Sequence, residues 1–310
     1  MDSYSTLKAG IVIPVFNRRE LTLRCLESLF STGSEEFRVI VVDSGSTDGT
    51  QKAISEKYPE VMLIQTSPSD WWTAATNAGI RNTMEAGCKY VLTYNDDNQA
   101  SLDVLHKLIT VAEQYPRSIV AAAVCDLNNP DTVIFAGRRR SRVTDRFIFM
   151  NHYQSYAGME KGLREVDLLH GKCTLFPVSV FQTVGLFDEE NLPHLFADDD
   201  LVLRAKHRGY RLLVDLDTVI LNNQTTTGLN PYDRRLDIGA IFGIFTSRKS
   251  AFQIKTRTRF LWRHRRSIIS FAITWCADYL RLLGIILLRW VVTDNLYRKI
   301  ERCYLRLPTI

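Results

Sequence analysis

Two adjacent carboxylates stand between carboxamides in the stretch Tyr94-Asn95-Asp96-Asp97-Asn98. The stretch follows an apolar run over residues 90–93, which predicts a buried strand, and precedes a helical pattern over 102–112. In open α/β sheets, ligands bind at the carboxyl ends of strands. Neighbouring carboxylates repel each other unless a cation or hydrogen-bond donors compensate them, so a hard divalent cation is a natural partner. An acidic turn that caps the next helix would explain the same residues, and the stretch alone leaves both interpretations open.

Strands and helices alternate through the first 125 residues. Apolar runs predict five strands, over residues 10–16, 37–42, 61–64, 90–93 and 119–124. Helical patterns follow the first four, over residues 21–29, 51–58, 73–86 and 102–112. This alternation predicts a mostly parallel sheet with right-handed crossovers. Further on, the chain predicts two helices, over 179–184 and 196–207, and two brief strands, over 210–214 and 218–221.

Three more acidic positions stand out. Asp43 ends the second predicted strand, Asp70 precedes two tryptophans, and Asp198 to Asp200 open a predicted helix. An Asx turn would explain the first, and the helix dipole would explain the triplet. Asp43 could instead be a carboxylate that binds a nucleotide. In the triplet, mutual repulsion could raise the pKa of one acid, as a general base requires. The Gly-Ser-rich turn after Asp43 has neither a P-loop nor a dinucleotide fingerprint, which disfavours ATPases and dehydrogenases.

Charge is distributed unevenly along the 310 residues. The formal net charge is +5, but residues 236–310 hold 14 Lys and Arg against 4 Asp and Glu, or +10, whereas the first 235 hold 25 against 30, or −5. This split predicts an acidic globular body with a basic segment for an anionic surface. The six scattered cysteines have no metal-binding or redox spacing, which favours a reducing, cytosolic setting. The first nine residues contain no apolar core of a secretion signal.

The basic segment is also apolar. It contains no acid between residues 238 and 277, and two uncharged runs, 267–277 and 282–288, are separated by Asp278 and Arg281. Each run is shorter than the ~20 residues that a spanning helix needs, so we predict an interfacial helix pair that binds an anionic membrane surface through residues 248–290. A packed helical subdomain or a dimer interface would explain the same pattern. No nucleic-acid-binding motif accompanies the charge.

Several motifs, in order, resemble the inverting family 2 glycosyltransferases of the GT-A fold. The resemblance covers roughly two thirds of the chain, residues 11–221. Its motifs are Ile13-Pro14-Val15-Phe16-Asn17-Arg18, residues 42–50, residues 72–80, Asn95-Asp96-Asp97, residues 184–189 and residues 198–204. The double Trp and the small-residue run after it look most like members that transfer rhamnose or galactofuranose.

The resemblance implies an α/β fold of the GT-A, Rossmann-like type. A mostly parallel sheet flanked by helices would carry a C-terminal helical, membrane-associated extension. Residues 1–125 would form the half that binds the nucleotide sugar, 126–235 the acceptor-binding and catalytic half of the same domain, and 236–310 the basic, apolar tail. Asp43 and Asp70 would contact the base and ribose of the donor, and Pro14 and Asn17 would shape the same pocket.

The resemblance also implies a metal site and a base. Asn95 and Asp97 would occupy the outer positions of the family's Asp-x-Asp motif, with Asp97 as the direct ligand of Mg²⁺ or Mn²⁺. Asp198 would be the catalytic base. Two departures weaken the metal shell, because Asn95 replaces an acid and Asn222 stands where many relatives carry a metal-ligating His. The remaining candidates for substrate or nucleotide contact are Trp72, Asn77, Asp96, His170, Gly171, Asp200 and Arg204.

The predicted activity is metal-dependent, inverting transfer of a sugar from a nucleotide diphosphate, such as a UDP- or dTDP-sugar, to a hydroxyl of a glycan or lipid-linked acceptor. Polysaccharide biosynthesis at the inner face of the cell membrane would be its setting. A sugar-nucleotide pyrophosphorylase is disfavoured, because no Gly-rich loop with a basic residue follows the first strand. A non-catalytic, membrane-associated sugar-nucleotide-binding protein with a degenerate metal site is the alternative, and Asn95 and Asn222 favour it. The sequence leaves the oligomeric state open.

Overall fold

The computed structural model describes residues 7–31, 36–224 and 237–292 of the chain. These residues form two compact units. Unit 1 holds the described residues up to 138 together with 150–224, and unit 2 holds 139–149 together with 237–292. The predicted tail is therefore accompanied in unit 2 by a short hairpin from the middle of the chain. Its last residues, 293–310 with Cys303, lie outside the described residues, and the predicted division of the larger domain at residue 125 stays a prediction.

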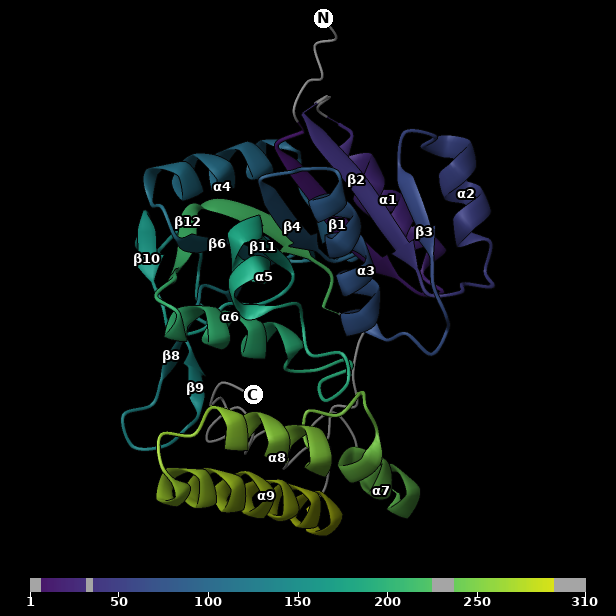
Figure 1. Ribbon diagram of the computed structural model, residues 1–310. Coiled ribbons are helices and arrows are strands. Elements are labelled where there is room, and N and C mark those ends of the chain that lie inside the picture. The colour runs from purple at the N-terminus through teal and green to yellow at the C-terminus, as the bar shows by residue number, and fades with distance from the viewer. Residues whose placement is uncertain (1–6, 32–35, 225–236, 293–310) are drawn as a thin grey trace, which may run out of the picture. The chain divides into compact units, whose positions relative to one another are not determined.

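Unit 1 is built on a ten-stranded sheet with helices on its faces (Figure 1). Its strands are β1 (Ala9–Val15), β2 (Phe37–Asp43), β3 (Met62–Gln65), β4 (Tyr90–Tyr94), β5 (Asn98–Gln99), β6 (Ser118–Asp126), β7 (Val133–Phe135), β10 (Leu163–Glu165), β11 (Cys173–Pro177) and β12 (Arg211–Asn222). Its helices are α1 (Arg19–Leu29), α2 (Thr50–Lys57), α3 (Trp72–Glu85), α4 (Asp103–Gln114), α5 (Val178–Val184) and α6 (Ala197–His207). The predicted α/β fold class is confirmed.

The main path of the sheet runs in the order β10-β12-β6-β11-β4-β1-β2-β3. The pairs β1–β2, β1–β4, β2–β3 and β6–β12 are parallel, whereas β11 is antiparallel to both of its neighbours. The two brief strands predicted over 210–214 and 218–221 are one strand, β12. Its register against β6 shifts between Asp215 and Val219, so a bulge absorbs the residues that separate the two predicted strands.

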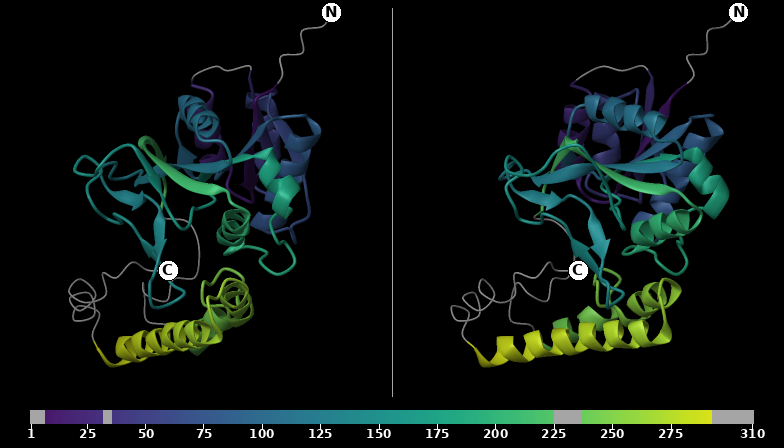
Figure 2. Two further views of the ribbon diagram at one scale, coloured as in Figure 1. Left: turned by 60° about the vertical axis from the view of Figure 1, so that its left-hand side comes forward. Right: turned by 90° about the vertical axis from the view of Figure 1, so that its left-hand side faces the viewer.

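Helices lie on both faces of the sheet, as Figure 2 shows from the side, and most residues of β1, β4, β6 and β11 are buried. Every residue of β1 is buried, which explains why this strand reads as a continuous apolar run rather than an alternating one. α3 packs against β1 at very short range, because a Cβ added at Gly79 would lie 2.4 Å from Val12 Cγ1. The small residues of the segment that forms α3 therefore serve a close contact between helix and sheet.

Unit 2 consists of three helices and a two-stranded hairpin. The helices are α7 (Ile238–Thr246), α8 (Ile254–Arg263) and α9 (Ile268–Val291), and the hairpin strands are β8 (Arg138–Arg140), which begins at the last residue of unit 1, and β9 (Phe147–Phe149). Five buried residues from α7, α9 and the segment between α7 and α8 form an apolar cluster: Ile244, Phe252, Tyr279, Leu282 and Ile286.

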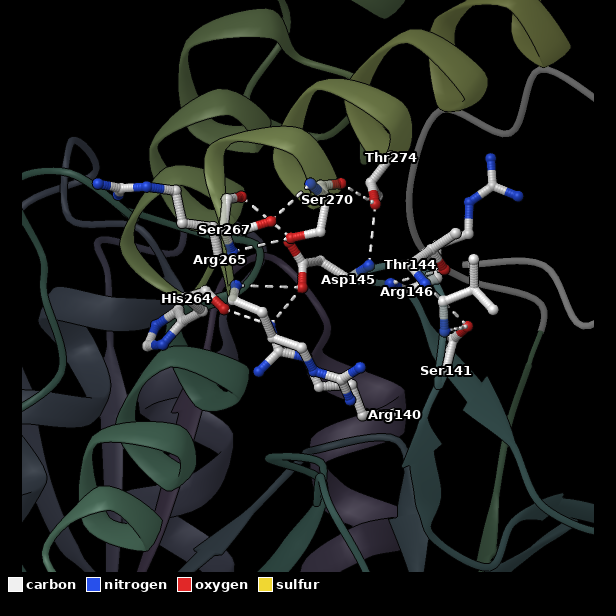
Figure 3. Close-up of polar contacts among 12 residues, drawn as sticks. Arg140, Ser141, Thr144, Asp145, Arg146, His264, Arg265, Ser267, Ser270 and Thr274 are labelled. Atoms are coloured by element: carbon white, nitrogen blue, oxygen red, sulfur yellow. Dashed lines mark hydrogen bonds and ion pairs between the residues drawn. The ribbon is translucent and has the colours of Figure 1, made fainter.

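Buried Asp145 fastens the hairpin to the N-terminus of α9 (Figure 3). Its Oδ2 accepts a hydrogen bond from Ser270 Oγ at 2.7 Å, and its Oδ1 lies 2.6 Å from Arg140 Nη2. Its backbone N–H donates to Thr274 Oγ1 at 2.9 Å. The Ser267 side chain accepts from Ser270 N, so the first turn of α9 has its own cap as well. These contacts explain why a hairpin remote in sequence belongs to unit 2.

The predicted interruption of the apolar tail at Asp278 and Arg281 is wrong. α9 runs unbroken through 24 residues. Asp278 does not break the helix because it is fully buried between two arginines, with Oδ1 2.6 Å from Arg146 Nη2 and Oδ2 2.5 Å from Arg257 Nη2. Residues 268–290 of this helix are long and apolar enough to cross a membrane by length and composition.

Candidate active site

Loops at one edge of the sheet of unit 1 gather most of the predicted site residues. β1, β2 and β4 run parallel, with Val15 paired to Asp43, so their carboxyl ends share that edge. β11 pairs antiparallel with β4, and its first residue, Cys173, lies opposite Tyr94, which brings its entry loop to the same edge. The end of β12 pairs with β5, which follows β4 directly. Polar side chains from distant stretches of the sequence therefore meet there.

The turns that follow β1 and β2 are fastened to each other by side chains. Asn17, whose φ is +50°, accepts a hydrogen bond from Thr47 N at 2.7 Å, and its own N–H donates to Ser46 Oγ at 2.8 Å. Asp43 Oδ1 accepts from Ser46 N at 2.7 Å, a local contact that reaches three residues on, one residue further than the Asx turn considered from the sequence. The backbone beside Pro14 and Asn17 is therefore fixed by these contacts.

Asp43 keeps one carboxylate oxygen without a hydrogen-bond partner. The residue is fully buried, and its Oδ2 accepts no hydrogen bond from the described residues. An unpaired buried acceptor costs about 1–3 kcal/mol, so a donor from a bound ligand would relieve that cost. Asp70 has a local contact instead: it lies half-buried in the turn before α3, where its Oδ2 accepts from Ser67 N at 3.2 Å.

Arg18 pairs with both members of the acidic dyad, Asp96 and Asp97. Its Nη1 lies 2.6 Å from Asp96 Oδ1, and its Nη2 lies 3.4 Å from Asp97 Oδ2. Both acids are buried. Burial raises the pKa of Asp96 to about 7, an effect that Arg18 opposes and Asp97 reinforces. The repulsion predicted between neighbouring acids is therefore compensated here by a guanidinium group.

Asn222 connects the acidic dyad to Lys172. Its Nδ2 donates to Asp97 Oδ1 at 2.7 Å and to Asn98 Oδ1 at 2.8 Å, and its Oδ1 accepts from Lys172 Nζ at 2.6 Å. Burial lowers the pKa of Lys172, an effect that Asp97 and Asp198 oppose. The ammonium group therefore lies in the electrostatic field of carboxylates from two separate motifs.

The oxygen atoms around Asp97 suit a hard divalent cation that is also coordinated by phosphate oxygens of a substrate. Asp97 offers a carboxylate and Asn95 an amide oxygen, and Asp96 Oδ2 is a buried carboxylate oxygen without a partner among the described residues. Ions such as Mg²⁺ are commonly held by one or two carboxylates together with substrate phosphates and water. The described ranges contain no group of three His, Cys, Asp or Glu side chains that could hold a metal ion alone. A cation at this position would depend on a ligand for the rest of its shell.

Asp198 joins the site from the first turn of α6. It is half-buried, and its Oδ2 accepts a hydrogen bond from Gly171 N at 2.7 Å. The space at Gly171 is tight, because a Cβ there would lie 3.0 Å from the Trp72 ring and 3.2 Å from Asp198 Cβ. Trp72 in turn donates from Nε1 to Asn95 Oδ1 at 3.2 Å. The predicted base, the predicted metal motif and one of the two tryptophans are thus neighbours.

The other two acids of the triplet are buried and paired with arginines. Asp199 Oδ2 lies 3.1 Å from Arg138 Nη1, and Asp200 Oδ2 lies 2.8 Å from Arg204 Nε. Arg204 also donates to the Leu186 carbonyl oxygen at 2.8 Å, which ties α6 to the turn that precedes it. Each acid of the triplet therefore has its own partner.

Two predicted substrate residues, Asn77 and His170, hold the backbone beside the site. Buried Asn77 donates to the Phe187 carbonyl oxygen at 2.9 Å and accepts from Phe187 N at 3.1 Å. The His170 ring packs edge-on against Phe135, and its Nδ1 accepts from Lys172 N at 2.8 Å. Burial lowers the pKa of His170 to about 3, so its ring is neutral at physiological pH. Their contact with substrate stays a prediction.

Sequence reasoning gives no role to Arg18 or Lys172, although both contact the site. Arg18 closes the motif at the end of the first strand, and Lys172 directly follows the predicted Gly171. The sequence indicated only that the adjacent acids Asp96 and Asp97 require a nearby positive charge. Arg18 lies 78 residues from Asp96 in the sequence, so only the folded chain identifies it as that cation.

A mostly parallel α/β sheet with polar side chains at its carboxyl edge defines a class of proteins that bind their ligands at the ends of the strands. Within that class, the chain belongs to the family described as Glycosyl transferase family 2, which matches residues 10–185. It is a glycosyltransferase, and the resemblance stated from its motifs is confirmed.

Two curated relatives illustrate the range of the family. Over 229 residues the chain is 27% identical to an N-acetylglucosaminyl-diphospho-decaprenol L-rhamnosyltransferase of Mycobacterium tuberculosis, a match that covers 67% of this chain and 74% of the relative. It is 24% identical over 165 residues to the low-salt glycan biosynthesis hexosyltransferase Agl10 of Haloferax volcanii, which covers 53% of this chain and 52% of that protein.

Two solved structures share the fold. GalNAc-T7 with UDP, GalNAc and Mn²⁺ aligns with a TM-score of 0.55 at 11% identity, over 72% of this chain and 44% of that one. The mannosyltransferase PcManGT from Pyrobaculum calidifontis, in complex with GDP-Man and Mn²⁺, aligns with a TM-score of 0.50 at 14% identity, over 96% of this chain and 88% of that one. At these identities the likeness establishes the GT-A fold.

Proposed function

We propose that unit 1 transfers a sugar from a nucleotide diphosphate, such as a UDP- or dTDP-sugar, to a hydroxyl of a glycan or lipid-linked acceptor. The observation that carries the proposal is one chain of contacts at the edge of the sheet. It leads from Asp97 through Asn222 to Lys172, and the preceding residue, Gly171, contacts Asp198. Residues that could bind a diphosphate, Asp97 and Lys172, therefore lie close to Asp198, which could accept a proton. The rhamnosyltransferase relative, whose name includes a lipid-linked sugar, supports the acceptor class.

In this proposal, the turns after β1 and β2 bind the sugar-nucleotide donor. The unpaired Oδ2 of Asp43 would accept a hydrogen bond from the nucleotide, and the fixed turn at Asn17 would hold the shape of its pocket. Pro14 and Asp70 would complete that pocket. Asp97 and Asn95 would hold Mg²⁺ or Mn²⁺, which supplies positive charge to the diphosphate leaving group when bound. The Mn²⁺ bound in GalNAc-T7 and PcManGT supports this choice of cation.

Asp198 would act as the general base. The acceptor oxygen would attack the anomeric carbon from the face opposite the diphosphate while its proton passes to the Asp198 carboxylate. As the new C–O bond forms, the bond from the anomeric carbon to the diphosphate oxygen breaks, and the configuration inverts. The N–H of Gly171 would keep the carboxylate oriented through this step. Asp200 and Arg204 would support the helix that carries the base.

The replacement Asp198→Asn tests this role. We expect it to lower sugar transfer or sugar-nucleotide hydrolysis by roughly 10²- to 10⁴-fold, because a positioned base contributes about that much. Nucleotide binding, measured by calorimetry, should change by less than about 2-fold, because the carboxamide keeps an acceptor for Gly171 N. The control is Asp217→Asn, an exposed acid of β12. Unchanged turnover in Asp198→Asn would remove Asp198 from this role.

We further propose that unit 2 binds an anionic membrane surface through residues 248–290 and keeps the enzyme at the inner face of the cell membrane. Support comes from the exposed face of α9, on which no residue from 268 to 290 is charged. The exposed residues are Ile268, Ile269, Ala272, Ile273, Cys276, Leu280, Leu283, Gly284, Leu287 and Trp290. Several large side chains are more than half exposed, among them Ile269 at 71% and Leu280 at 68%.

Three polar residues of α9 lie on its opposite, buried face, while Arg281 is partly exposed. Asp278 is fully buried, Arg289 is 6% exposed, and Thr274 is fully buried. A spanning helix would be apolar all round, whereas one apolar face and one packed polar face suit a helix that lies in the membrane interface. The exposed basic residues of the helical segment are Arg248, Lys249, Lys255, Arg259, Arg263 and Arg266. Each would gain about 1 kcal/mol beside anionic lipid.

Flotation of the full chain with vesicles tests this proposal. We expect the protein to float with vesicles that contain anionic lipid and to float less as salt is raised, because salt screens the basic side chains. Neutral vesicles of equal size are the control. A protein that stays in the soluble fraction with anionic vesicles at low salt would refute the membrane proposal and leave the transferase proposal untouched.

A further inference from the structure

We propose that Lys172 is a binding residue for the donor's diphosphate, a fixed cation that acts beside the divalent ion. The inference rests on the proposed function of unit 1 and assigns a residue that the motifs leave without a role. Three observations carry it: the single hydrogen bond of the ammonium group, its place between two functional carboxylates, and the charge balance of its surroundings.

The ammonium group of Lys172 is only partly satisfied. It can donate three hydrogen bonds. Within the described residues, one is accounted for, the 2.6 Å contact with Asn222 Oδ1. Asn222 is fully buried and neutral, and its own amide is oriented by Asp97 and Asn98. The lysine is thus held in place by a neutral group, with donors left for another acceptor.

Lys172 stands between the two groups that the reaction must bring together. On one side, Asn222 links it to Asp97, the predicted cation ligand. On the other side, the preceding residue, Gly171, donates its N–H to Asp198, the predicted base. The bond that breaks in a glycosyl transfer lies between the diphosphate and the sugar that the acceptor attacks. A cation between these two carboxylates is therefore suited to the phosphate next to the sugar.

Charge balance distinguishes Lys172 from the other cation of the site. The guanidinium group of Arg18 is already shared between Asp96 and Asp97. Lys172 forms no ion pair of that kind among the described residues, since its contact is with an amide. Lysine is a common phosphate ligand because its ammonium acts as a compact point charge. A dianionic diphosphate would supply the partner that the protein does not.

Nucleotide binding in the absence of metal tests the assignment. The full chain would be titrated calorimetrically with UDP, dTDP and GDP and with the matching monophosphates, in EDTA and in Mn²⁺. The measured quantity is the ratio of diphosphate to monophosphate affinity. In Lys172→Met we expect this ratio in EDTA to fall by roughly 10- to 100-fold, the effect of one charge-assisted hydrogen bond. In Lys172→Arg, which keeps the charge, it should stay within about 3-fold of the wild type.

A purely structural lysine would give a different pattern. If it only oriented Asn222, Lys172→Met would weaken diphosphates and monophosphates equally or lower the melting temperature, and an unchanged affinity ratio would overturn the inference. Should Lys172→Met melt early, Lys172→Gln, which can still donate to Asn222, replaces it and must show the same loss of ratio. A wild-type chain that binds none of these nucleotides, with or without Mn²⁺, would contradict the proposed function itself. Binding with an unchanged ratio would contradict the role of Lys172 alone.

Discussion

Units 1 and 2 distribute charge in opposite ways. In unit 1, apolar strands such as β1 are fully buried, and the ionisable side chains of Arg18, Lys172 and Asp198 keep solvent access at the edge of the sheet. In unit 2, Asp278 and Arg257 are buried against each other, while isoleucines and leucines of α9 are exposed. The first arrangement suits water and a polar ligand. The second suits an apolar surrounding on one side of the unit.

The ion pairs of the two units differ in their exposure and surroundings. At the edge of unit 1, Arg18, whose side chain is partly exposed, pairs with two buried acids that we propose as neighbours of a bound cation. In unit 2, Asp278 is fully buried, and its two carboxylate oxygens pair with Arg146 and Arg257. The first set lies among the residues proposed to bind the donor, whereas the second connects α9 to the hairpin and to α8.

The largest expected effect is that of removing the buried acid of unit 2. We expect Asp278→Ala to destabilise the chain by about 3–5 kcal/mol, because it leaves the buried Arg257 and the partly exposed Arg146 without their counter-ion. Denaturant unfolding followed by tryptophan fluorescence, to which Trp262, Trp275 and Trp290 of unit 2 contribute, measures this change. The exposed substitution Asp217→Asn should stay within about 0.5 kcal/mol. A loss below about 1 kcal/mol for Asp278→Ala would contradict the view that this ion pair holds α9.

Charges placed on the outer face of α9 should act on membrane binding and not on folding. Leu280→Glu with Leu287→Glu should weaken binding to anionic vesicles by on the order of 100-fold, since each buried leucine is worth at least about 1.5 kcal/mol. Unfolding free energy should change by less than about 0.5 kcal/mol, because both side chains are exposed. Leu163→Glu, at an exposed position of β10 in unit 1, is the matched control. Equal vesicle binding by all three proteins would contradict the proposed face.

A smaller effect concerns His170 in unit 1. Its pKa in the folded chain is lowered to about 3, so the unfolded chain, with an ordinary pKa near 6.5, binds more protons as pH falls. Stability should therefore decrease below pH 6.5, by about 2 kcal/mol at pH 5 relative to pH 8 from this group. Unfolding curves of wild type and His170→Gln across this range measure the difference. An identical pH dependence in both proteins would contradict a buried, neutral His170.

Sequence patterns predicted the parts of the fold that depend on local order. The five strands of the first 125 residues and the helices between them are present, because apolar runs ending in Gly, Ser, Asp and Asn determine both the strand and the turn. In the turn after Asp43, the carboxylate accepts a hydrogen bond from the backbone of Ser46, so part of its role is local. The family could also be identified from the sequence, because its motifs are short, local and in a fixed order along the chain.

Features that depend on distant contacts were not predictable in the same way. Asp278 reads as an interruption of an apolar run until Arg146, from a hairpin 132 residues earlier, is found beside it. Two brief strands read as separate until β6 pairs with both and a bulge joins them. The link between Lys172 and Asn222 spans 50 residues, so neither residue alone suggests it. Such contacts follow from the tertiary fold and leave no local pattern.

A thermal-shift screen of UDP-, dTDP- and GDP-sugars with Mn²⁺ tests most directly whether the edge of unit 1 is a nucleotide-sugar site. A specific ligand stabilises the native state by mass action, about 2.7 kcal/mol at 100 times its dissociation constant. We expect at least one nucleotide sugar to raise the melting temperature of the wild type by several degrees. We expect that rise to be lost in Asp43→Ala and reduced in Asp97→Asn. A wild type that responds to no nucleotide sugar, or a response that is unchanged in both variants, would contradict the account.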